Sequence, residues 1–271
     1  MADKRKFEQP GVDSNTVAEL SKKLLEANAK LQAAELERKL MLENISHDLR
    51  APLTAIRSAI DYLKQHTSAD NKKELDREEL SSMLGMIDTR TSTLEVLVKD
   101  LYYLTCVESE KADFDLEKVP LGQFLEEYYF GAEIDSRYQD NELILNIADD
   151  YRTIVSIDVL KMQRVLDNLF TNAHKYSGKG DVIELGAYDK DDMACFYVRD
   201  TGIGIPKDSL EHIFDRTYRV SDARTPSKEA SSGLGLTIVK SIVEKHNGRV
   251  MCESKENQGS IFTVMLPRGD K

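Results

Sequence analysis

A heptad repeat constrains the N-terminal part of this chain more than any other feature of its sequence. From Val17 to Leu63, apolar or small residues recur at steps of three and four, with one interruption at Arg38. This spacing places them on one stripe of an α-helix and predicts a helix over residues 16–66. Such a helix would be about 75 Å long at about 1.5 Å per residue. Pro52 lacks a backbone donor and should kink it.

A second helical stripe follows a polar stretch and runs from Leu80 to Leu101. Two long helices joined by a short polar link form a helical hairpin. One hairpin with a sparse stripe on each helix buries little, whereas two hairpins form a four-helix bundle with a closed core. We therefore expect a homodimer. The alternative is a long monomeric helix packed on the rest of the chain, but the stripe is too long for the remainder to cover.

The second half of the chain mixes helical and strand periods. A stack of strands and helices in two layers is an α/β sandwich. The segment Lys118–Pro120 reads as a turn in a linker. The predicted helices are 121–138, 158–176, 207–216 and 234–246, and the predicted strands are 143–147, 152–157, 182–188, 194–199, 249–254 and 260–266.

The predicted fold class is thus α + α/β, a dimeric helical hairpin followed by an α/β sandwich. Residues 1–40 would form a coiled-coil signalling helix or a truncated stub. Residues 41–110 would form the hairpin, residues 111–120 the linker and residues 121–271 the sandwich.

Charge and composition restrict the partners and the compartment. The net charge of −11 disfavours nucleic acids and anionic membranes as partners. No apolar run approaches the roughly 18 residues of a membrane span, and the N-terminus lacks the apolar core of a signal peptide. Three widely separated cysteines fit a reducing compartment. We expect a cytoplasmic chain without a membrane segment, which could be the cytoplasmic portion of a longer membrane-bound sensor.

His47 lies in the segment ISHDLRAPL (residues 45–53), off the apolar stripe, so it should face outward at least partly. A neutral imidazole is a good nucleophile near physiological pH. A lone histidine on a helix is usually only a solvated side chain, so its interpretation depends on the motifs downstream.

The string NxxxNxxKY (residues 168–176) combines groups suited to a nucleotide. Asn168 and Asn172 are four apart, so their amides share a helix face. Amide oxygens can hold Mg²⁺ without adding negative charge beside a triphosphate. Lys175 can counter phosphate charge, and Tyr176 offers a flat wall for a base. Two asparagines alone would more often be surface groups, but the full string is specific.

Two glycine-containing segments complete the predicted nucleotide site. In DTGIGI, Gly202 and Gly204 permit a tight turn, and Asp200 could accept a hydrogen bond from the adenine amino group. A lone segment of this kind is weak evidence, because such turns are common in loops.

In SGLGL, Gly233, Gly235 and Leu236 open a helix whose free N–H groups can bind phosphate. Residues 221–232 are nearly free of apolar side chains and predict a mobile lid, with Arg219 beside it as a phosphate contact.

Together these segments resemble sensor histidine kinases of two-component systems over residues 40–268. Their ATP-binding domain is shared with a wider group that includes Hsp90 and MutL. The resemblance implies that His47 accepts the γ-phosphoryl group of ATP, that Asp48 is its acid/base partner, and that Mg²⁺ is required. It also implies transfer of the phosphoryl group to an aspartate of a response-regulator receiver domain.

One departure from the family concerns dephosphorylation. The family uses Thr, Asn or Gln four residues after the histidine to orient water, and here that residue is Ala51, which cannot form a side-chain hydrogen bond. We expect a competent kinase with weak phosphatase activity.

Two alternatives remain open. An Hsp90-like ATPase needs a carboxylate base in the asparagine helix, where the only candidate, Asp167, is offset from the asparagine face. A non-catalytic dimeric adaptor would bind ATP and a regulator without phosphorylating itself.

Overall fold

The computed structural model describes residues 14–67, 76–109, 112–215, 218 and 233–269. The chain divides into two units, residues 1–47 and 48–271. Helix α1 (Ser14–Thr67) confirms the long predicted helix and contains Pro52 without ending there. Leu20, Leu24 and Leu31, which belong to the predicted stripe, are about 60% exposed (60%, 63% and 59%). The single chain therefore leaves the N-terminal part of this stripe uncovered, whereas Ile45 and Ala59 further along it are buried.

Helix α2 (Arg77–Glu108) has its buried residues near its C-terminal end. Leu97, Leu104 and Val107 are almost inaccessible, whereas Leu80 and Leu84 of the predicted stripe are exposed. The buried face packs against α5 (Gly235–Lys245), and the buried Asp100 pairs with Arg164 on α4 (Val159–Tyr176). The helix thus has two apolar faces, and the sequence predicted only the exposed one.

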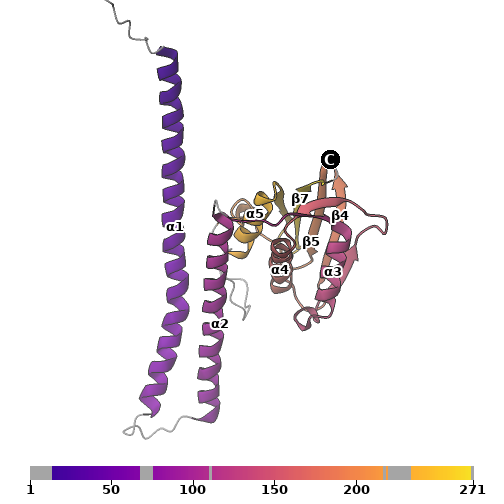
Figure 1. The fold of residues 1–271 in the computed structure, drawn as a ribbon. Coiled ribbons are helices and arrows are strands. Elements are labelled where there is room, and N and C mark those ends of the chain that lie inside the picture. The colour runs from indigo at the N-terminus through magenta and orange to yellow at the C-terminus, as the bar shows by residue number, and fades with distance from the viewer. Residues whose placement is uncertain (1–13, 68–75, 110–111, 216–217, 219–232, 270–271) are drawn as a thin grey trace, which may run out of the picture. The chain divides into compact units, whose positions relative to one another are not determined.

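A five-stranded sheet and three helices form the α/β sandwich (Figure 1). The strand order is β2-β4-β5-β7-β6, in which β2 and β4 are parallel and the other pairs are antiparallel. Helices α3 (Leu121–Glu133), α4 and α5 pack on the sheet. The strand bounds are β2 Glu142–Asn146, β4 Val182–Lys190, β5 Met193–Asp200, β6 Arg249–Ser254 and β7 Ser260–Pro267.

The apolar side of α4 fills the core between helices and sheet. Met162, Val165, Leu166, Leu169 and Phe170 are all fully buried. Because these residues occupy one face of the helix, they turn the remaining face, with its polar residues, away from the core.

The ends of α4 and α5 are tied together by a buried histidine. His246, 3% exposed, donates from Nδ1 to the Ile242 carbonyl at 2.8 Å and accepts at Nε2 from the Asp158 N–H at 2.9 Å. Asp158 is also the N-cap of α4, since its carboxylate accepts from the Lys161 N–H at 3.1 Å. The imidazole is therefore held neutral, and burial lowers its pKa.

The structure corrects three sequence predictions. The turn predicted at Lys118–Pro120 is part of strand β1 (Glu117–Pro120), which pairs with β3 (Ile154–Ile157). A four-residue strand that ends in proline shows too little alternation to be recognised. The helix predicted over 121–138 ends at Glu133, and a short 3₁₀ helix η1 (Ser136–Tyr138) follows.

The third correction concerns residues 207–216. Their described part contains a 3₁₀ helix, η2 (Lys207–Ser209), and further turns. The hydrogen bonds span three residues, as from His212 N–H to the Ser209 carbonyl and from Asp215 N–H to the His212 carbonyl. The segment therefore winds as successive tight turns rather than as the predicted α-helix. Among the described residues, no helix is both long enough and apolar enough to cross a membrane.

Candidate functional site

His47 is exposed on α1 and belongs to the first unit of the chain. Asp48 is half-buried, and Ala51, one helical turn further on, is exposed. The apolar neighbours of this segment are turned the other way, since Ile45 is only 6% exposed. The structure thus places the imidazole on an accessible helix face, as the heptad spacing predicted.

Asn168 lies on the polar face of α4 with its amide oriented by its own helix. Its Nδ2 donates to the Arg164 carbonyl at 2.9 Å. A Cβ added at Gly235 would lie 3.1 Å from Asn168 Oδ1, so this oxygen faces the first residue of α5. Asn172, half-buried, follows on the same face. Two amide groups on this face supply neutral oxygen donors, which fit Mg²⁺.

Asp200 ends β5, as predicted, and is 4% exposed. Its Oδ1 accepts from the Gly202 N–H at 3.0 Å and from the Ser260 N–H at 3.2 Å. Burial raises the pKa of this carboxyl, and the two backbone N–H groups oppose that rise. The carboxylate is therefore held in a fixed direction at the end of the strand.

Gly202 fixes the loop after β5 against the end of α4. A Cβ at this position would lie 2.2 Å from the Tyr176 carbonyl oxygen, closer than any side chain can come. The same carbonyl accepts from the Ile203 N–H at 3.1 Å. Close approach of two backbones explains why this position needs glycine.

The turn between β6 and β7 braces the loop from the other side. Gly204 and Gly259 have φ values of 65° and 82°, in the left-handed region. A Cβ at Gly204 would lie 2.1 Å from the Lys255 carbonyl oxygen, and one at Gly259 would lie 2.0 Å from that of Asp200. The Asn257 N–H also donates to the Ile203 carbonyl at 2.7 Å.

The start of α5 offers backbone donors. Gly233 has a φ of 68°, α5 begins at Gly235, and the N-cap residue, Leu234, has no polar side chain that could cap the helix. The first N–H groups of a helix and its dipole favour an anion at this end. Leu236, which follows, is half-buried. Arg219 and the lid predicted over 221–232 lie outside the described residues.

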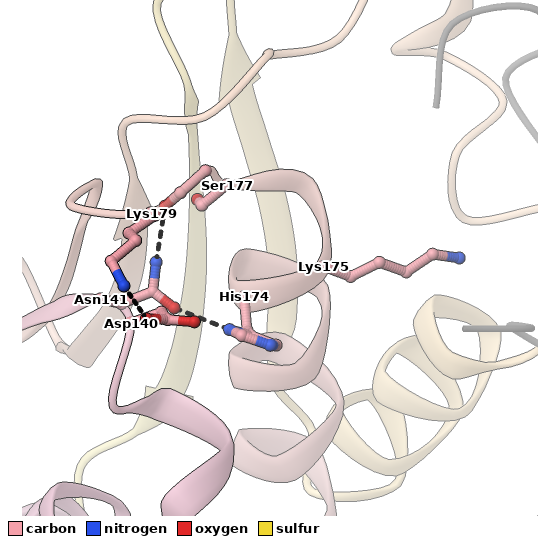
Figure 2. A pocket seen from close by; sticks show the side chains of 7 residues that line it. Asp140, Asn141, His174, Lys175, Ser177 and Lys179 are labelled. Carbon is pink, nitrogen blue, oxygen red and sulfur yellow. Dashed lines mark hydrogen bonds and ion pairs between the residues drawn. The ribbon is translucent and has the colours of Figure 1, made fainter. Parts of the chain in front are cut away.

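Lys175 and Tyr176 form the last turn of α4. The Lys175 ammonium lies 5.1 Å from the centre of the Tyr176 ring, which is 36% exposed. Figure 2 shows that Lys175 extends away from the side of the helix where His174 lies. An exposed aromatic ring and a cation therefore stand next to the Asp200 loop.

The structure brings together most of the predicted nucleotide-binding residues. Asn168 adjoins Gly235, and Tyr176 adjoins Gly202, whose N–H bonds to Asp200. Sequence reasoning missed the contact of Ser260 with Asp200, because Ser260 contributes through its backbone and the fold brings it across from another strand. The site suits an adenine nucleotide with a divalent cation. It combines a fixed carboxylate, an exposed aromatic ring, neutral amide oxygens and the N-terminus of a helix.

Asp167, the one carboxylate that could serve as a base in this helix, is engaged elsewhere. Its Oδ1 accepts from the Tyr128 hydroxyl on α3 at 3.0 Å. This contact turns the Asp167 carboxylate toward α3, and its position next to Asn168 places it off the asparagine face.

Two family models match the chain. Residues 37–110 match the His Kinase A (phospho-acceptor) domain, and residues 157–270 match the histidine kinase-, DNA gyrase B-, and HSP90-like ATPase. The sensor histidine kinase WalK of Bacillus subtilis (strain 168) is 35% identical over 233 residues, which cover 85% of this chain and 37% of WalK. The sensor histidine kinase YclK of the same organism is 29% identical over 248 residues, 92% of this chain and 50% of YclK. The chain thus spans half or less of these two relatives.

Among solved structures, the histidine kinase ThkA in complex with the response regulator protein TrrA shares the fold. The TM-score is 0.66 at 24% sequence identity, and the match covers 96% of this chain and 68% of that chain.

Proposed function

Because the chain belongs to the histidine kinases, with a phospho-acceptor domain followed by an ATPase domain, we propose that it phosphorylates His47 with Mg-ATP. It then passes the phosphoryl group to an aspartate of a response-regulator receiver domain. The observation that carries the proposal is the exposed His47 within the matched phospho-acceptor domain. In the same chain Tyr176 and Asp200 both contact Gly202, and Asn168 adjoins the start of α5.

The base of ATP binds at the end of α4. Asp200 accepts a hydrogen bond from the adenine amino group, and its own contacts to Gly202 and Ser260 hold it in direction. The Tyr176 ring covers the base. The turn at Gly204 keeps the loop in place.

The phosphates bind at the N-terminus of α5, where Gly233, Gly235 and Leu236 present backbone N–H groups. Lys175 and Arg219 add positive charge. The amide oxygens of Asn168 and Asn172 would hold Mg²⁺, which when bound neutralises charge on the triphosphate.

The chemical step is an in-line displacement. An imidazole nitrogen of His47 forms a bond to the γ-phosphorus, the bond from that phosphorus to the bridging oxygen breaks, and ADP leaves. Asp48 accepts or shares the proton of the other ring nitrogen of His47. Such catalysis is mainly positioning and electrostatic stabilisation. The proposal requires that the ATP-binding domain bring the γ-phosphate to His47.

In the second step a receiver-domain carboxylate attacks the phosphohistidine, the P–N bond breaks, and an acyl phosphate forms. The solved complex of ThkA with TrrA supports a partner of this class. The uncovered leucines of α1 (59–63% exposed) support a homodimer as the working form. The net charge of −11 argues against nucleic-acid partners. The three widely separated cysteines support a cytoplasmic location. Ala51 next to His47 keeps phosphatase activity weak.

The test is incubation with γ-labelled ATP and Mg²⁺, followed by acid and alkali treatment. We expect acid-labile, alkali-stable label on the wild type and none on His47→Gln. His66→Gln is the matched control, because His66 lies on the same helix and its Nδ1 bonds to the Tyr62 carbonyl at 2.9 Å. Phosphate release without protein label would instead favour an ATPase, and nucleotide binding without turnover would favour an adaptor.

The ATPase alternative is disfavoured by the contact of Asp167 with Tyr128, because that contact engages the one carboxylate in the asparagine helix that could activate water.

A further inference from the structure

The last turn of α4 is anchored on the side opposite the proposed nucleotide. His174 lies one residue before Lys175 and two before Tyr176. At 3.6 residues per turn these are about 100° and about 200° further around the helix. The rotation of this turn about its axis therefore sets where Lys175 and Tyr176 point, and a contact that fixes His174 also fixes them.

His174 is held by Asn141, in the loop before β2. Its Nδ1 lies 2.6 Å from Asn141 Oδ1 (Figure 2). Asn141 Nδ2 donates to the Gly178 carbonyl at 3.2 Å and to the Asp181 carbonyl at 3.4 Å. Because the amide nitrogen faces two carbonyls, the amide oxygen must face the imidazole, and Nδ1 of His174 is the donor.

Asn141 thus joins both sides of the helix end. One group of its amide binds the last turn of α4, and the other binds residues 178–181, which lead into β4. The loop is closed further by the Gly180 N–H, which donates to the Asp140 carbonyl at 2.7 Å.

The His174 ring is also packed in place. It meets the Tyr138 ring edge-on at 5.7 Å, and Tyr138 meets Phe170 at 5.8 Å. The ring therefore has one orientation, fixed by packing on one side and by the Asn141 hydrogen bond on the other.

We propose that Asn141 is a positioning residue for the nucleotide: through His174 it sets the rotation of the last turn of α4, and so the placement of Tyr176 and Lys175. The inference rests on the proposed function, because it assigns the base and the phosphates to these two side chains. Asn141 acts through His174 and does not itself touch the nucleotide.

The test compares Asn141→Leu with Asn146→Leu. Both asparagines use their amides in hydrogen bonds; Asn146, at the end of β2, donates to Glu184 at 2.8 Å and to the Tyr197 hydroxyl at 2.9 Å. Asn146 thus matches Asn141 in residue type and number of bonds donated, but its contacts lie on other strands and not on α4. Leucine has the same number and branching of side-chain heavy atoms as asparagine but is bulkier, and a pocket of about 220 Å³ beside Asn141 leaves room for it.

The readouts are titration with the fluorescent trinitrophenyl derivative of ATP in Mg²⁺, and initial labelling rates of His47 over a range of ATP concentrations. We expect Asn141→Leu to raise Kd and KM about tenfold, which corresponds to the loss of its one hydrogen bond to α4, with kcat nearly unchanged. Asn146→Leu should leave both constants near wild type at a similar loss of Tm. Equal Kd values for the two variants would overturn the proposal.

If Asn141→Leu does not fold, two substitutions at His174 test the positioning role of the contact between Asn141 and His174. His174→Asn keeps a donor close to the position of Nδ1, whereas His174→Leu removes it. The proposal predicts near-normal Kd for the first and about a tenfold rise for the second, and equal Kd values would contradict it.

Nucleotide titration needs no phosphoryl transfer, so the two proposals fail separately. If the wild type binds the probe but does not label His47, the kinase proposal is wrong. If the wild type labels His47 and Asn141→Leu binds the probe with normal affinity, the positioning role of Asn141 is wrong.

Discussion

Replacing Asp200 with asparagine should change which base the site prefers. The carboxylate is 4% exposed, and its Oδ1 already accepts from the Gly202 and Ser260 N–H groups at 3.0 and 3.2 Å. Asparagine keeps an oxygen for these two bonds, so the loop should retain its shape. Its other group becomes an NH₂ donor, which would meet the adenine amino group donor to donor.

The size of the effect follows from the bond that is lost. A hydrogen bond to a charged acceptor contributes about 1.5–3 kcal/mol, so ATP affinity should fall by roughly 10- to 150-fold. Inosine triphosphate carries a carbonyl in place of the amino group. It should bind the variant better than ATP does, whereas the wild type should prefer ATP.

The assay is competition of each nucleotide against the fluorescent ATP derivative, with Tm measured in parallel. Burial disfavours the Asp200 charge, so a neutral amide of the same shape should not lower Tm. Asp189→Asn is the control, since Asp189 accepts from the Tyr151 and Thr153 hydroxyls at 2.8 and 2.7 Å, remote from the loop. An Asp200→Asn variant that keeps the ATP preference of the wild type would refute the assignment of Asp200 to the base.

Gly202→Ala should lower nucleotide affinity at least about tenfold, because its Cβ would lie 2.2 Å from the Tyr176 carbonyl oxygen and the two backbones must separate. Unchanged affinity in the same titration would count against a role for the close approach of Gly202 to Tyr176. The buried His246 has a pKa below its ordinary 6.5, so the unfolded chain binds more protons than the folded one when the pH drops. The contribution of His246 to the free energy of unfolding is therefore fully present above about pH 6.5 and is lost as the pH falls below it. Denaturant titrations at about pH 7.5 and about pH 5.5 should show this loss in the wild type and a smaller one in His246→Gln, which can still accept from the Asp158 N–H; equal losses would exclude His246 as the cause. Ala51→Thr should speed decay of a phosphorylated receiver partner, and no gain over the wild type would argue against a role for this position.

Periodicity in the sequence predicted the long elements well. The strand predicted over 249–254 is β6, and the helix predicted over 158–176 is α4 from Val159. In α4 the apolar residues recur on one buried face, and in β6 half-buried residues alternate with exposed ones. The helix predicted over 207–216 was wrong, because a short run of helix-forming residues does not ensure hydrogen bonds from residue i to i+4. In this segment the hydrogen bonds span three residues instead.

The sequence predicted which residues form the site but not how they contact one another. Spacing identified Asn168 and Gly235 separately, yet only the fold shows that the Arg164 carbonyl holds the amide and turns Oδ1 toward Gly235. Ser260 and Asn141 could not be found from the sequence. The first acts through a backbone N–H, and the second through the neighbour that packing gives it.

The most direct measurement locates the phosphoryl group. The chain is incubated with Mg-ATP, digested under alkaline conditions that preserve phosphohistidine, and its peptides are analysed by mass spectrometry. We predict a single modified peptide, the one that contains His47. A chain that binds ATP with both domains folded, yet leaves residue 47 unmodified or carries the phosphate elsewhere, would contradict the account.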